Sequence, residues 1–145
     1  MTSSATGGDV VRAYLDIMNR LDMDAFAELV TDDVVVALPY APDPVPQRTE
    51  GKAAVVALYG GFPSLVAPLG FHDVTVRPLG AAEEGRAEDF LATYRSDSTM
   101  LATGLPYRND YISLFTVRAG KLAAFTEYFD PLVFRLAQGA TVSGP

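Results

Sequence analysis

The chain has 145 residues, of which 49% are hydrophobic, and this size and composition suit one globular domain with a substantial core. Eighteen acidic against eleven basic residues give a formal net charge of -7, which repels phosphate backbones and anionic lipid surfaces, so neither nucleic acid nor a membrane is expected as a partner. The absence of cysteine and the single histidine exclude disulfides, thiolate metal sites and histidine-rich metal sites.

The ends of the chain give no sign of a targeting segment. The opening letters MTSSATGG lack the basic and apolar regions of a secretion signal, and no later apolar run is long enough to span a bilayer. We therefore expect a cytoplasmic protein with a single domain over residues 1–145. Within it, residues 1–8 are expected to be disordered and residues 138–145 to be flexible.

The first half of the chain predicts mainly helices. Asp9 is an N-cap candidate for a run of apolar residues at helical spacing, namely Val10, Val11, Tyr14, Met18 and Leu21. Further helices are predicted over 22–30 and 52–59, the second followed by a Gly-Gly break and a shorter helical piece. Between them, the β-branched run 34–38 predicts a strand, and the proline-rich segment 39–51 predicts a loop that shapes an opening.

After Gly70 the apolar period changes to two, which predicts strands. The candidate strands cover residues 71–79, 87–97, 105–118 and 121–129, separated by glycine-containing turns. They form an antiparallel meander, and Asp130-Pro131 then begins a short final helix. The predicted fold class is α+β: a curved antiparallel sheet covered by the N-terminal helices, with an apolar pocket between the two layers.

Glu127 interrupts an apolar face of the last predicted strand. Side chains two residues apart share a face, which groups Glu127 with Ala123, Phe125 and Phe129. Burial among such neighbours should raise the pKa of the carboxyl group, as a general acid or base working near neutral pH requires. The alternative is a glutamate at the rim of the sheet, either paired with an arginine or solvated.

The preceding strand carries polar side chains on one parity, namely Tyr107, Asn109, Tyr111 and Ser113. For Asn109 and Tyr111, substrate contact and ordinary cross-strand packing both remain open. Tyr14 points inward from the first predicted helix. It either donates a hydrogen bond to the substrate or packs in the core with its hydroxyl bonded to a backbone carbonyl. His72 shares a face with the apolar residues that follow it, so it lies either at the pocket mouth, where it could titrate near neutrality, or in solvent.

The order helix, helix, strand, helix and meander resembles the ketosteroid-isomerase-like, SnoaL-like superfamily of cone-shaped α+β barrels. The segments that carry the resemblance are VVRAYLDIMNRLDMDAFAELVTDDVVV, GKAAVVALY and the final hairpin with EYFDP. The superfamily contains isomerases, polyketide cyclases, epoxide hydrolases and binding modules, so the fold alone does not choose a function. The resemblance also implies a homodimer that forms through the outer face of the sheet.

Residue by residue, the resemblance points to Glu127 and Tyr14. Glu127 corresponds to the catalytic carboxylate of SnoaL-like cyclases, and Tyr14 corresponds to the oxyanion-hole tyrosine of the isomerases. Leu38 and Ser113 stand where relatives keep groups that transfer protons, which is a departure from the family pattern.

Epoxide hydrolases of the superfamily resemble one another in an Arg-x-Asp pair on a middle strand. Here Arg95 and Asp97 have the right spacing. The alternation of the strand instead favours three other inward residues, Phe90, Ala92 and Tyr94.

Together these observations predict a cofactor-free and metal-free enzyme that cyclises or isomerises an apolar, polyketide-type small molecule. The candidate catalytic residues are Glu127, Tyr14 and His72. The expected substrate contacts are Asn109, Tyr111, Ser113, Tyr94, Phe90, Phe115, Phe125, Phe129 and Leu38. The alternatives are a non-catalytic member that binds a small ligand and an epoxide hydrolase.

Overall fold

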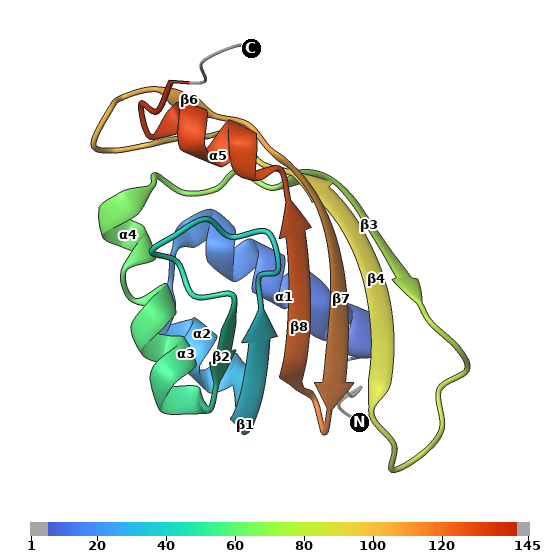
Figure 1. Cartoon of the computed structure of the whole chain (residues 1–145). Helices are drawn as coiled ribbons and strands as arrows, with labels where there is room; N and C mark the ends of the chain where they lie inside the picture. The colour runs from blue at the N-terminus through green and yellow to red at the C-terminus, as the bar shows by residue number, and fades with distance from the viewer. Residues whose placement is uncertain (1–5, 142–145) are drawn as a thin grey trace.

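The structure is a computed structural model that describes residues 6–141, and its main feature is a curved six-stranded sheet in the order β2-β1-β8-β7-β4-β3 (Figure 1). Helix α1 lies across strands β3, β4, β7 and β8, and α5 lies at one end of the sheet. The elements are α1 (Gly7–Arg20), α2 (Met23–Leu29), β1 (Val30–Ala37), β2 (Arg48–Glu50), α3 (Lys52–Tyr59), α4 (Phe62–Leu65), β3 (His72–Pro78), β4 (Glu88–Arg95), β5 (Ser98–Thr99), β6 (Pro106–Tyr107), β7 (Asp110–Arg118), β8 (Lys121–Phe129) and α5 (Pro131–Ala137).

The predicted antiparallel meander is confirmed for β3, β4, β7 and β8. Two features of the sheet were not predicted. Strand β1 pairs with β8 in parallel, so the sheet is mixed at this side, and the proline-rich loop ends in the short strand β2, which pairs with β1. The third predicted strand is divided, because residues 106–107 pair with β5 in a separate two-stranded sheet.

The first helix begins earlier than the sequence predicts. Thr6, not Asp9, is the N-cap: its hydroxyl accepts a 3.1 Å hydrogen bond from the Asp9 amide, while the Asp9 carboxylate accepts one from the Thr6 amide. This reciprocal pair is a capping box, which needs a hydroxyl three residues before the acid. Gly7 and Gly8 are therefore helical, and the remainder of the predicted disordered start, residues 1–5, lies outside the described residues, as do residues 142–145.

The inner face of the sheet is built from rows of side chains that lie opposite one another on three neighbouring strands. From β4 through β7 to β8 the rows are Phe90, Phe115 and Phe125; Ala92, Ser113 and Glu127; and Tyr94, Tyr111 and Phe129. The middle row has two small side chains beside one carboxylate, between two aromatic rows. A bulge at Ala123 shifts the register beyond Phe125, so both Leu122 and Ala123 are buried. The small side chains of the middle row leave room for polar groups inside an otherwise apolar layer.

The opposite face of the same strands is open. Ile112 is 53% exposed and Leu114 is 41% exposed, on the alternate positions of β7. Within residues 6–141, no helix combines the length and the apolar character that a membrane crossing needs.

Candidate active site

Glu127 is held by a short chain of hydrogen bonds across three strands. The Tyr94 hydroxyl donates to Oε2 of Glu127 at 2.8 Å and lies 2.7 Å from Oγ of Ser113. Because the single proton of Tyr94 goes to the carboxylate, Ser113 is the donor in the second bond. The order Ser113 to Tyr94 to Glu127 therefore suits an ionised carboxylate, and among residues 6–141 Tyr94 is its one recorded hydrogen-bond donor.

Burial raises the pKa of Glu127 to about 7, and the hydrogen bond from Tyr94 opposes this rise. A carboxyl group normally titrates near pH 4, so at neutral pH this one is divided between its protonated and ionised forms. Such a group can take a proton and return it without a large energetic penalty in either direction. The sequence prediction of a perturbed carboxyl on the apolar face agrees with this geometry.

Glu127 lines a narrow apolar cavity between the sheet and the helices, with a volume of about 70 Å³. Its carboxyl is the one charged group on the cavity wall within residues 6–141. The lining residues are Tyr14, Met18, Leu38, Val45, Tyr59, Phe62, Leu65, Val66, Leu69, Phe71, Tyr107, Tyr111, Glu127, Phe129 and Phe134. An apolar enclosure with one carboxyl group and no cationic side chain favours a neutral ligand over an anionic one.

Five buried tyrosines surround the carboxyl group: Tyr14, Tyr59, Tyr94, Tyr107 and Tyr111. Desolvation is the largest cause that raises the pKa of each phenol, and the charge of Glu127 raises all five further. For Tyr107 the value reaches about 12. These phenols are therefore neutral at physiological pH and act as hydrogen-bond donors and acceptors rather than as bases.

Tyr14 is almost completely buried and lines the cavity together with Tyr59. Its ring packs on Phe125 and Phe115 with centroid distances of 5.0 and 5.4 Å. The helical spacing correctly predicted the inward direction of this side chain. Tyr14 is thus a core residue that also borders the cavity, and its hydrogen bond to a substrate stays a prediction.

The cavity contains only part of the predicted contact set. Leu38, Tyr111 and Phe129 line it, while Tyr94 and Ser113 lie outside the lining and support the carboxylate. The predicted walls Phe90, Phe115 and Phe125 are wrong in detail, since these side chains are buried but do not line the cavity. They form the row of side chains two residues away from Glu127 along the strands, where aromatic rings fill the core.

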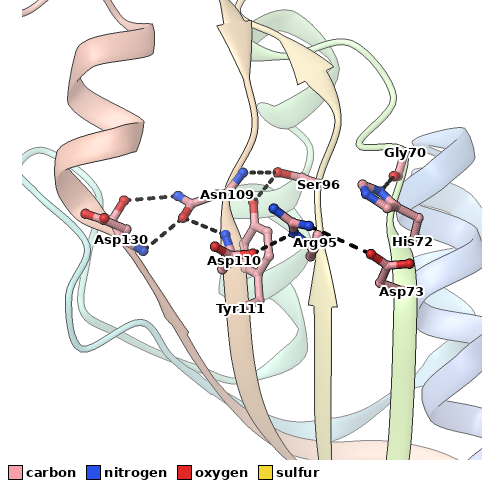
Figure 2. A network of polar contacts seen from close by, with 9 residues as sticks. All are labelled: Gly70, His72, Asp73, Arg95, Ser96, Asn109, Asp110, Tyr111 and Asp130. Carbon is pink, nitrogen blue, oxygen red and sulfur yellow. Dashed lines mark hydrogen bonds and ion pairs between the residues drawn. The ribbon is translucent and has the colours of Figure 1, made fainter.

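Asn109 is buried but does not line the cavity. Its side-chain amide donates to the Tyr107 hydroxyl and to the backbone carbonyl of Asp130, each at 3.0 Å. Its Oδ1 accepts from the backbone amides of Asp110 and Asp130 (Figure 2). Both protons and the oxygen of the Asn109 side-chain amide are already hydrogen-bonded within the protein. Asn109 therefore connects the start of β7 to the start of α5 and does not contact the cavity.

His72 is exposed and does not belong to the cavity, which corrects the catalytic assignment. Its Nδ1 lies 3.0 Å from the carbonyl oxygen of Gly70 (Figure 2). Asp73 has φ +52° and the β3–β4 register shifts between His72 and Thr75. The alternation from Val74 onward therefore does not extend back to the histidine.

Arg95 and Asp97 are exposed on the alternate positions to Tyr94 and Ser96. Arg95 pairs with Asp110 at 2.8 Å on this outer side (Figure 2), and Asp97 pairs with Arg108 at 3.2 Å. The inward Arg-x-Asp pair that an epoxide hydrolase of this superfamily would need is therefore missing here. The strand pattern that favoured Tyr94 inside is confirmed.

Helices and loops supply most of the cavity wall, and the sequence did not point to these residues as wall residues. Met18 could have been found, because it lies one helical turn after Tyr14 on the same face. The others come from segments whose approach depends on the tertiary fold: Val45, Tyr59, Phe62, Leu65, Val66, Leu69, Phe71 and Phe134. Tyr107 has the same parity as Tyr111 but belongs to β6, which precedes β7 in the chain. No cluster of three or more metal-ligating side chains occurs within residues 6–141.

Comparison with known proteins gives the same fold. The curated protein YesE of Bacillus subtilis is 31% identical over 133 residues, which cover 92% of this chain and 87% of that protein. The crystal structure of a "putative isomerase" from Bacillus subtilis is 31% identical, has a TM-score of 0.79 and covers 92% of both chains. The structure of a "putative polyketide cyclase" from Pseudomonas putida is 22% identical, with a TM-score of 0.76 and coverage of 92% of this chain and 98% of that one.

The sequence model of the SnoaL-like domain matches residues 11–125, from the first turns of α1 to the middle of β8. Glu127 lies just beyond this matched segment, so its role depends on the geometry described above. The match covers most of the chain and agrees with the cavity, the curved sheet and the relative in Bacillus subtilis. On these grounds, the protein belongs to the SnoaL-like domain family.

Proposed function

We propose that the protein is a cofactor-independent isomerase or cyclase of a neutral small molecule, with Glu127 as the group that moves the proton. The observation that carries this proposal is a single carboxyl group with a pKa of about 7 inside an apolar cavity. A carboxylate in such surroundings is a stronger base than one in water, because desolvation disfavours its charge.

The reaction begins when the ionised Glu127 takes a proton from a carbon next to a carbonyl group of the substrate. The electron pair of the broken C–H bond moves onto the carbonyl oxygen and forms an enolate. If the protonated Glu127 returns the proton to a different carbon, the product is an isomer. If the enolate carbon attacks a second carbonyl group, a C–C bond closes a ring, and Glu127 gives its proton to the new alkoxide.

Tyr94 and Ser113 keep the carboxylate in place during this transfer. The hydroxyl of Tyr94 stabilises the ionised form of Glu127 and fixes one of its two oxygens. The second oxygen is left for the proton that moves. Tyr14 is a candidate donor to the substrate, since its hydroxyl belongs to the cavity wall.

A polyketide-type substrate is the finer part of the proposal. Its support is the apolar wall and the likeness to the Pseudomonas putida protein named above. A cavity of about 70 Å³ is much smaller than the several hundred Å³ usual for sites that hold a drug-sized ligand. A substrate of that size therefore needs the mouth to open, and the partly exposed lining residues Val45, Phe62 and Leu65 are the side chains that would move.

A second candidate is a non-catalytic member that binds a small apolar ligand. Leu38 on the cavity wall and Ser113 beside Glu127 favour it, because neither side chain can act as an acid or a base at neutral pH. In that case Glu127 would serve only to orient a ligand hydroxyl.

The test is the metabolite mass profile of the source strain carrying Glu127→Gln, a nearly isosteric change that removes the proton-transfer group. The matched control is Glu28→Gln, the same substitution at an exposed position of α2. Accumulation of a compound isomeric with the normal product supports the proposal. A compound that differs by one water would assign the protein to hydrolysis or dehydration instead. A folded, abundant variant with an unchanged profile would overturn the catalytic proposal in favour of ligand binding.

A further inference from the structure

Besides the Ser113, Tyr94 and Glu127 chain, a second cluster of hydrogen-bonded hydroxyls borders the same cavity. Tyr111 is the centre of this group, with its hydroxyl 3.0 Å from that of Tyr107 and 3.2 Å from Oγ of Ser96. Tyr107 and Tyr111 line the cavity, whereas Ser96 is buried behind them. Figure 2 shows the contacts of Ser96 with Tyr111 and with Asn109.

Asn109 supplies a donor to each end of this chain of hydroxyls. Its backbone amide donates to Oγ of Ser96 at 2.9 Å, and its side-chain amide donates to the Tyr107 hydroxyl at 3.0 Å. The other proton of the side-chain amide goes to the Asp130 carbonyl. Asn109 is therefore a positioning residue that occupies one acceptor site on Ser96 and one on Tyr107.

A count of protons shows what the group lacks. The hydroxyls of Ser96, Tyr107 and Tyr111 carry one proton each, and Tyr111 is the donor in both contacts, so its single proton can serve only one of them at a time. Within residues 6–141, no acceptor is found for the protons of the Tyr107 and Ser96 hydroxyls. The Tyr107 hydroxyl accepts from Asn109 and from Tyr111, so its own proton is left without a partner on the cavity wall. A buried donor without an acceptor is unfavourable, and a ligand oxygen would remove this deficit.

We propose that Tyr107 and Tyr111 form a hydrogen-bond donor site for a carbonyl oxygen of the ligand, in the same cavity as Glu127. The assignment defines the substrate class as a neutral compound with a carbonyl group. Its catalytic meaning rests on the proposed function: the oxygen that becomes negative in the enolate would lie against neutral phenol donors that are already oriented.

The electrostatics support this arrangement. The charge of Glu127 raises the pKa of both Tyr107 and Tyr111, so the base and the donor pair interact across the cavity. When the proton moves to Glu127, the negative charge moves to the substrate oxygen, and the net charge in the cavity stays the same. Donors already oriented in an apolar site stabilise such a charge more strongly than water does.

The first experiment compares two small probes on the unchanged protein by NMR-detected titration. The probes are cyclohex-2-en-1-one and 3-methylidenecyclohexene, which carries CH2 in place of the carbonyl oxygen. An apolar cavity without a donor would bind the hydrocarbon more tightly, because burial of an unpaired carbonyl is unfavourable. We expect the enone to bind more tightly. Tighter binding of the hydrocarbon, or no binding of either probe, would overturn the proposal.

The second experiment removes the donors. The double variant Tyr107→Phe/Tyr111→Phe is expected to weaken enone binding by about tenfold, as for the loss of one hydrogen bond, and to leave hydrocarbon binding within about twofold. Each single variant keeps one phenol on the wall and should show a smaller loss. Ser96→Ala is the control inside the network, since it disturbs the packing but keeps both phenols, and Tyr128→Phe is the control on the outer face of β8.

A spectroscopic readout separates hydrogen bonding from packing. With a ¹³C-labelled carbonyl, the infrared stretch of the bound enone should move to higher wavenumber in the double variant and stay unchanged in Ser96→Ala. An unchanged stretch and affinity in the double variant would contradict the donor site. Glu127→Gln is expected to keep enone binding, so a failure of Glu127 as the proton carrier is distinguishable from a failure of this site.

Discussion

The hydroxyl of Tyr94 lies 2.8 Å from Oε2 of Glu127, and this contact joins the middle strands of the sheet at the cavity. The ring of Tyr94 also stacks on that of Tyr111, with centroids 5.0 Å apart and an interplanar angle of 11°. One side chain therefore supports the carboxylate with its hydroxyl and the proposed donor site with its ring. The two polar parts of the cavity depend on the same residue of β4.

Removal of the Tyr94 hydroxyl should raise the pKa of Glu127 above its present value of about 7. The hydrogen bond stabilises the ionised form, and a bond to a charged group is worth roughly 1.5–3 kcal/mol, so Tyr94→Phe is expected to shift the pKa upward by about one unit or more. The measurement is an NMR titration of the ¹³C-labelled carboxyl group. Tyr128→Phe, on the opposite face of the sheet, should leave the value unchanged; a fall in Tyr94→Phe would show that the hydroxyl does not stabilise the charge.

Glu127 should make the protein less stable as the pH rises. Its pKa is raised on folding, from 4.5 to about 7, so the folded state binds more protons than the unfolded state between these values. Stability from this group is therefore greatest below pH 4.5, falls as the pH rises to about 7, and is constant above. The difference corresponds to about 3 kcal/mol.

Glu127→Gln removes this titration and should be more stable than the unchanged protein at pH 8. At pH 5, where the glutamate is protonated in the folded protein, the two should differ much less. Urea unfolding of both proteins at pH 5 and pH 8 measures the effect, with Glu28→Gln as the exposed control. Equal differences at both pH values would mean that Glu127 is not protonated on folding.

If Glu127 is the base in its ionised form, kcat/KM should rise with pH through about 7 and then level off. This profile requires the substrate, once identified, to be assayed from pH 5 to pH 9. In Tyr94→Phe the midpoint should move upward together with the pKa of the carboxyl group. A profile that falls through pH 7 would instead assign the protonated form, and thus a general acid, to the slow step.

The aromatic row beside the cavity should dominate stability. Phe115 is 1% exposed and packs on Tyr14 and Phe125, so Phe115→Ala is expected to lower the free energy of unfolding by about 3–5 kcal/mol. Ile112 lies on the outer face of the same strand, and Ile112→Ala should cost less than about 1 kcal/mol. Similar losses in urea unfolding of the two variants would contradict the assignment of inner and outer faces.

Gly70 should be intolerant of any side chain. Its φ is +60°, and a Cβ would lie 2.6 Å from the carbonyl oxygen of Asp97, so Gly70→Ala adds a backbone clash to the conformational strain. Gly85 has φ +77° with open space around it, which makes Gly85→Ala a control for the strain alone. Thermal unfolding should show the larger loss for Gly70→Ala; equal losses would mean that the chain near Asp97 moves aside.

The element types could be predicted because the sequence expresses them locally. The apolar period changes from helical spacing before Gly70 to alternation after it, and Asp22 and Asp130 cap the helices that the sequence placed after them. The Thr6 cap was missed because a capping box depends on a pair of residues three apart. The parallel pairing of β1 with β8 was also missed, since it joins segments far apart in the chain.

For the site, the alternation of polar and apolar residues in β8 and the helical spacing of α1 were enough to place Glu127 and Tyr14 inside. Parity along one strand or helix is a local property, so these inward directions follow from the sequence alone. The inward position expected for His72 was wrong, because Asp73 has a positive φ and interrupts the alternation between Val74 and His72.

Only the tertiary structure decided how the inward residues divide between core and cavity. Phe125 and Phe129 share a strand face with Glu127, yet only Phe129 lines the cavity, because α1 and its tyrosine fill the space over Phe125. The partners of Asn109 and the spare proton of the Tyr107–Tyr111 pair likewise depend on contacts between β4, β6, β7 and α5. Such contacts depend on distances between segments that are remote in sequence, and no local pattern encodes them.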